Sequence, residues 1–108
     1  MIPQIQPAEL KSMLDEGAPV LLLDVRQPEE HETAALPNSK LIPLAQLIGR
    51  AKEIEAWKDE DVVVYCHHGV RSLAAANWLV AQGVGRVFNL EGGIDIWSVR
   101  VDPKVRRY

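Results

Sequence analysis

The sequence lacks several features that mark secreted and membrane proteins. It contains one cysteine in 108 residues, so it cannot form an internal disulfide. No apolar run approaches the length of a membrane-spanning helix. The opening residues, Met1 to Gln4, lack the basic and apolar regions of a signal peptide. We therefore expect a cytoplasmic protein that does not bind a membrane.

An excess of charge of one sign is also lacking. The chain has 12 lysines and arginines and 15 aspartates and glutamates, interspersed, for a net charge of −3. This balance gives no surface for nucleic acid or for an anionic membrane. The basic group of Lys104, Arg106 and Arg107 is too short to change that expectation.

The features that the sequence does have predict one small α/β domain over residues 1–108. Apolar residues make up 47% of the chain, enough for one core, and there is no internal repeat. Continuous apolar runs at residues 20–25 and 62–65 are typical of parallel strands covered on both faces. Shorter strands are expected at residues 41–42 and 86–89. Helical spacing or helix-ending glycines predict helices at residues 7–16, 44–57, 71–82 and 92–98. This alternation predicts a parallel, doubly wound sheet with helices on both faces.

The lone cysteine stands where such a sheet places its ligands. Cys66 directly follows the strand at 62–65 and directly precedes a helix. Unpartnered N–H groups and the helix dipole at this point stabilise an anion, so the thiol is expected to ionise and act as a nucleophile. Gly69 supplies the positive φ that a tight concave loop requires. The alternative is that Cys66 is a small buried hydrophobe.

Neighbouring residues favour the functional alternative. Arg71 lies in the first helical turn, where a cation opposes the helix dipole, and such a local conflict indicates a functional site. His67 and His68 would be unusual in a segment that simply crosses a core. Ser72 also has a structural explanation, since its hydroxyl can bond helix-terminal N–H groups.

Other polar and aromatic residues have simpler explanations. Asp24 is expected to be a buried hydrogen-bonding anchor, and Arg26 is expected to pair with nearby carboxylates. His31 lies in a charged, exposed helix and is assigned no role. A zinc site is not expected, because structural zinc usually needs four well-separated ligands and no second cysteine exists. The three tryptophans are expected to pack against the core: Trp57, Trp78 and Trp97.

Three segments resemble one family. Residues 66–71, Cys-His-His-Gly-Val-Arg, resemble the active-site loop of rhodanese-like sulfurtransferases, which has a cysteine, two variable residues, a glycine, one residue and an arginine. Residues 22–30 and 89–97 are similar to that family's first and closing signatures. Residues 34–39, Ala-Ala-Leu-Pro-Asn-Ser, depart from the family's Gly-His-Ile-Pro-Gly-Ala. The resemblance implies one rhodanese-like domain with about five parallel strands.

The resemblance also implies a chemistry that needs no cofactor. Cys66 would take sulfur from a small anionic donor such as thiosulfate, form a persulfide and pass the sulfur to a thiol or a sulfur-carrier protein. Arg71 would attract the donor, and His67, His68, Gly69 and Val70 would line the site. Ser72, Asp24 and Arg26 would support it. The loop is also similar to rhodanese domains attached to adenylyltransferases. Neither the physiological donor nor the oligomeric state is encoded in these motifs.

Two alternatives compete with sulfur transfer. Cysteine-dependent phosphatases place five residues between cysteine and arginine, whereas this chain has four, His67 to Val70. The shorter loop has a smaller ring of N–H groups, which favours a terminal sulfur over a tetrahedral phosphate. A non-catalytic rhodanese-fold binding module is the second alternative. Loss of the loop cysteine usually marks such modules, and Cys66 is present.

Overall fold

Five parallel strands form the central layer of the structure. The computed structural model describes residues 2–108. Its strand order is β1-β5-β4-β2-β3, which confirms the predicted parallel α/β sheet. The sequence did not predict β1, because two residues carry no periodic pattern. The strands are β1 (Gln4–Ile5), β2 (Val20–Asp24), β3 (Lys40–Leu41), β4 (Asp61–Tyr65) and β5 (Arg86–Leu90).

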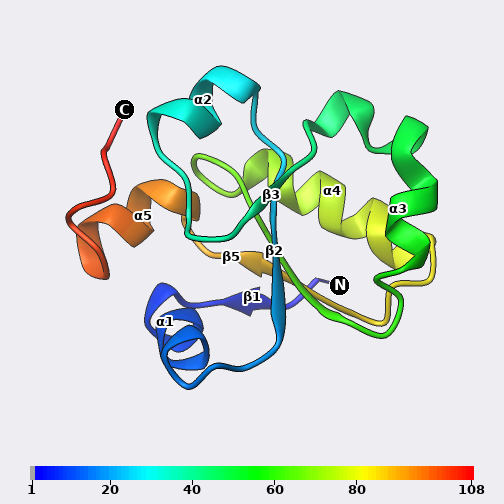
Figure 1. Cartoon of the computed structure of the whole chain (residues 1–108), viewed down its shortest axis with the longest axis horizontal. Coiled ribbons are helices and arrows are strands. Elements are labelled where there is room, and N and C mark those ends of the chain that lie inside the picture. The colour runs from blue at the N-terminus through cyan, green and yellow to red at the C-terminus, as the bar shows by residue number, and fades with distance from the viewer. Residues whose placement is uncertain (1) are drawn as a thin grey trace.

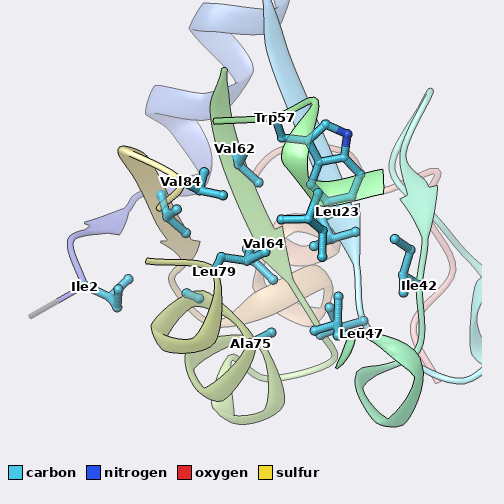
Figure 2. Close-up of a cluster of buried hydrophobic side chains, with 14 of the residues drawn as sticks. Ile2, Leu23, Ile42, Leu47, Trp57, Val62, Val64, Ala75, Leu79 and Val84 are labelled. Carbon is cyan, nitrogen blue, oxygen red and sulfur yellow. The ribbon is translucent and has the colours of Figure 1, made fainter. Parts of the chain in front are cut away.

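Helices cover both faces of this sheet (Figure 1). The helices are α1 (Pro7–Asp15), α2 (Pro28–Thr33), α3 (Ala51–Glu55), α4 (Val70–Ala81) and α5 (Gly93–Arg100). Val62 and Val64 of β4 face a core cluster formed with α4 and the segment before β4, shown in Figure 2. Val63 and Tyr65 face a second cluster, formed with α1 and α5. Because both faces are covered, β4 reads as a continuous apolar run.

The register of the central strands determines where the site forms. In the β2–β4 pair, Val20 lies opposite Asp61 and Asp24 lies opposite Tyr65. Both strands therefore end at the same level, and the segments that follow them leave from the same edge of the sheet. Those segments contain Arg26 and Cys66.

The prediction of one continuous helix at residues 44–57 is wrong. The structure has two 3₁₀ turns, η1 (Leu44–Gln46) and η2 (Ile48–Arg50), followed by the short α3. Gly49 lowers helix stability at the interruption, and Arg50 has φ −116° and ψ 27°, outside the helical region. Ile48, expected on the apolar stripe, is 73% exposed, whereas Leu47 and Ile54 are buried.

The tryptophans and the remaining helices follow their predicted patterns closely. Trp57 and Trp97 are buried, and Trp78 is partly buried against the first cluster. Within residues 2–108, each helix is too short or too polar to cross a membrane.

Candidate active site

Cys66 lies buried directly beyond β4, with its sulfur facing the start of α4. Its Sγ accepts hydrogen bonds from the backbone N–H groups of Gly69, at 3.1 Å, and Ser72, at 3.4 Å. Gly69 caps α4 with a φ of +104°, as the sequence predicts, and this left-handed conformation turns the chain around the sulfur. Two backbone dipoles therefore point at the one atom expected to carry charge.

The hydroxyl of Ser72 adds a third contact to the sulfur. The Cys66 thiol donates to Ser72 Oγ at 3.4 Å, and Ser72 Oγ donates in turn to Asn89 Oδ1. Asn89, on β5, is 2% exposed, and its amide nitrogen donates to the Gly69 carbonyl and to Gln4 Oε1, both at 3.1 Å. Asn89 thus holds both the hydroxyl and the loop backbone. Sequence reasoning noted Asn89 only as part of a signature, because these partners lie on separate elements.

The first turn of α5 holds the other side of the loop. Ile94 N–H donates to the Cys66 carbonyl at 2.9 Å, and Asp95 N–H donates to the His67 carbonyl at 3.1 Å. These bonds bring Gly93 against the loop backbone, where a Cβ would stand 2.4 Å from the carbonyl oxygens of Cys66 and His67. A glycine at position 93, the first residue of α5, is therefore required by a close backbone approach.

Arg71 is not a free cation beside the sulfur. Its guanidinium forms a two-point ion pair with Glu30 of α2, with Nη1–Oε1 at 2.6 Å and Nη2–Oε2 at 2.9 Å. These bonds lower the pKa of Glu30 to about 2, although partial burial opposes the shift. The same pair raises the pKa of Arg71 above its usual value. Sequence reasoning missed Glu30 because its partner is 41 residues away.

The two loop histidines differ in their surroundings. The His67 ring is half-buried and stacks on both His68 and Tyr108, with centroid distances of 4.0 Å. Burial lowers the pKa of His67, which favours the neutral form of the ring. His68 is exposed, with Nδ1 3.9 Å from Asp95 Oδ2, and Val70 is 78% exposed. His68 and Val70 thus form the outer side of the loop, and Tyr108 covers His67.

Asp24 and Arg26 form a buried ion pair beneath the site. Both are 0% exposed, and Arg26 donates to the two carboxylate oxygens of Asp24 at 2.8 and 2.7 Å. Arg26 Nη1 also donates to Tyr108 Oη at 2.7 Å. α2, which carries His31, has no buried residue, in agreement with the expected exposed helix, but His31 is partly covered and its Nδ1 lies 2.7 Å from Asp24 Oδ2. The helix carrying His31 folds back over the end of β2, which the local sequence does not show.

Residues 102–108 complete the surroundings of the loop. This segment runs from α5 toward α2 (Figure 1). Tyr108 Oη donates to Glu30 Oε2 at 2.8 Å, and Arg107 Nε donates to Asp95 Oδ1 at 2.9 Å. The Tyr108 hydroxyl therefore links the Asp24–Arg26 pair to the Glu30–Arg71 pair. The sequence offered no signal for this contact.

Comparison with known proteins agrees with this architecture. A family model described as the rhodanese-like domain matches residues 6–100. A sulfurtransferase of Allochromatium vinosum is 40% identical over 91% of this chain and 90% of its own length. The rhodanese-like/PpiC domain-containing protein 12 of Arabidopsis thaliana, a chloroplastic protein, is 40% identical over 99% of this chain, which spans only 38% of that protein.

A solved structure has the same fold. The crystal structure of a rhodanese-related protein from Thermoplasma volcanium superposes with a TM-score of 0.83 at 33% identity, covering 96% of this chain and 97% of that one. The family model covers nearly the whole chain, in agreement with the sequence resemblance. The chain belongs to the rhodanese-like domain family.

Proposed function

We propose that this protein is a sulfurtransferase that carries a sulfane sulfur as a persulfide on Cys66. The observation that carries the proposal is the pair of N–H groups, from Gly69 and Ser72, aimed at Cys66 Sγ. Such donors stabilise negative charge on sulfur at the start of a helix. Membership of the rhodanese-like family and a relative named a sulfurtransferase support this function.

The first half-reaction loads Cys66. With thiosulfate as the donor, the Cys66 thiolate attacks the outer sulfur and forms a new S–S bond. The S–S bond of the donor breaks, and sulfite leaves with the electron pair. The persulfide keeps one negative charge, which the loop N–H groups stabilise. Once the thiol proton is gone, the Ser72 hydroxyl, 3.4 Å from Sγ, can turn from Asn89 Oδ1 and donate its single proton to the anion.

The second half-reaction removes the sulfur from Cys66. A thiophilic acceptor attacks the outer persulfide sulfur, the S–S bond breaks and the Cys66 thiolate returns. Cyanide serves as an acceptor in vitro. We place the protein in the cytoplasm, where the acceptor is a thiol or a sulfur-carrier protein. We assign the approach to Cys66 to five residues: His67, His68, Gly69, Val70 and Arg71. Ser72 contacts Cys66 Sγ directly, whereas the Asp24–Arg26 pair reaches the loop through Tyr108, which stacks on His67.

Intact mass spectrometry tests this proposal. The protein is incubated with thiosulfate or with a small-molecule persulfide, and we expect a gain of one sulfur that disappears on addition of cyanide. The Cys66→Ser variant serves as the control and should fold normally but gain nothing, since a hydroxyl is far less ionised at neutral pH. An unchanged mass of the parent with both donors would reject sulfur transfer and favour the binding-module alternative.

A further inference from the structure

Three arginines near the loop are each matched by a carboxylate. Arg26 pairs with Asp24, Arg71 with Glu30, and Arg107 with Asp95, all with N–O distances of 2.6 to 3.3 Å. A two-point contact between guanidinium and carboxylate is the strongest geometry for such a pair. None of these three arginines therefore presents an unneutralised positive charge to an incoming anion.

Glu30 is held firmly in its ion pair with Arg71, at the end of the loop around Cys66. Both of its carboxylate oxygens bind Arg71, Oε2 accepts a further bond from Tyr108 Oη at 2.8 Å, and Oε1 accepts one from the Gln27 N–H at 3.0 Å. The side chains of Arg71 and Glu30 are 36% and 20% exposed, so the pair faces solvent. A solute approaching Arg71 therefore meets the carboxylate together with the guanidinium.

The hydrogen bonds to the sulfur come from uncharged groups. Within residues 2–108, the hydrogen bonds to Cys66 Sγ come from the N–H groups of Gly69 and Ser72 and involve the Ser72 hydroxyl. A dianionic donor is attracted by Arg71 and repelled by Glu30, and because their charged groups are 2.6 and 2.9 Å apart the two effects oppose each other and cancel in part. A donor of low charge loses nothing from this cancellation.

We propose that Glu30 sets the charge preference for the sulfur donor. By neutralising Arg71, Glu30 favours persulfides of uncharged thiols over dianionic thiosulfate. The proposal rests on the proposed sulfur transfer and narrows its substrate class. With such a donor, the Cys66 thiolate attacks the terminal sulfur of R–S–SH, the donor S–S bond breaks, and R–S⁻ leaves with the electron pair. The proton stays on the sulfur that is transferred, so no oxidant or reductant is needed.

Charge selectivity at Cys66 can be measured without sulfur transfer. Iodoacetate and iodoacetamide alkylate thiols with the same leaving group but differ by one negative charge. The Glu30→Gln variant removes the carboxylate charge and keeps a residue that suits this position of α2. Glu29→Gln is the matched control, because Glu29 is exposed on the same helix and its side chain makes no hydrogen bond or ion pair among the described residues.

We expect the ratio of iodoacetate to iodoacetamide rates to rise about fivefold in Glu30→Gln and to stay unchanged in Glu29→Gln. Half-molar salt should reduce the increase, because it screens partly exposed charges. A ratio that changes less than twofold, or equally in both variants, would overturn the proposal. Failure of both reagents to modify Cys66 in folded protein would also overturn it, since no small anion could then reach the loop.

Donor kinetics provide the second measurement. In Glu30→Gln, the KM for thiosulfate should fall about fivefold with kcat nearly unchanged, whereas the KM for 2-mercaptoethanol persulfide should stay constant. A merely structural role for Glu30 would change both donors alike, and that result would overturn the proposal. If neither donor transfers sulfur while the alkylation ratio still shifts, sulfur transfer fails and the role of Glu30 in charge selection survives.

Discussion

Gly93 lies against the backbone of Cys66 so closely that no side chain could be accommodated there. A Cβ on Gly93 would stand 2.4 Å from the Cys66 carbonyl oxygen, far inside van der Waals contact. This approach lets the Ile94 N–H reach the same carbonyl at 2.9 Å. The position of the loop around Cys66 therefore depends on the absence of a side chain at Gly93 of α5.

Gly93→Ala should destabilise the protein by about 2–4 kcal/mol, because overpacking costs ~1–3 kcal/mol and a left-handed alanine costs ~1 kcal/mol more. Gly93 has φ +63°. Gly49→Ala is the control, since a Cβ there meets nothing within 4 Å, and it should leave the stability unchanged or raise it by up to about 1 kcal/mol. Urea denaturation measures both. Equal stability of the two variants would show that the loop moves freely away from α5.

Arg71→Met should make the protein less stable at neutral pH, by about 1 kcal/mol or less for a partly exposed pair. The helix dipole alone predicts the opposite sign, since Arg71 opposes it. The ion pair with Glu30 reverses that expectation.

The pH dependence identifies the source of this loss. The pKa of Glu30 is lowered from 4.5 to about 2 in the folded protein, so its stabilising contribution is present above pH 4.5 and disappears as the pH falls through 2. The stability difference between parent and Arg71→Met should shrink over that interval in urea titrations. A difference independent of pH would mean that Arg71 acts through packing.

Ser72→Ala should slow sulfur loading from thiosulfate about tenfold, because it removes the hydroxyl beside Cys66 Sγ and leaves the loop N–H groups in place. This is below the 10²–10³ typical for loss of a full oxyanion donor. Ser98→Ala is the control, since its hydroxyl bonds the Ile94 carbonyl within α5. Stopped-flow or quenched mass measurements follow loading. Equal rates in both variants would confine Ser72 to a structural role.

Hydrolysis of aryl phosphates should be negligible, because four residues separate Cys66 from Arg71 and the loop N–H groups converge on one sulfur atom. Inserting one residue between Gly69 and Arg71 should raise the hydrolysis rate. A p-nitrophenyl phosphate assay measures both proteins. Clear hydrolysis by the parent that is lost in Cys66→Ser would reverse the preference for sulfur transfer over phosphate chemistry.

Local patterns predicted the sheet and the place of the sulfur atom. The apolar runs of β2 and β4 indicated strands covered on both faces, because each strand contributes side chains to two core clusters. Cys66 at the end of β4 and Gly69 with its positive φ follow from residue types only three positions apart. Such features depend on residues that are close in the sequence, so the spacing of residue types can predict them. The interruption at η1 and η2 was missed because apolar spacing continued through Gly49.

The sequence by itself determined strands β2 to β5, the helix after Cys66 and the place of the cysteine between β4 and that helix. Tertiary structure decided which partners those residues have: Glu30 for Arg71, Asn89 for Ser72, and Tyr108 for both Arg26 and Glu30. Strand order β1-β5-β4-β2-β3 brings these residues together from distant segments. A hydrogen bond or ion pair requires its two groups within a few ångströms, and no spacing in the chain encodes that distance when the groups lie on different elements.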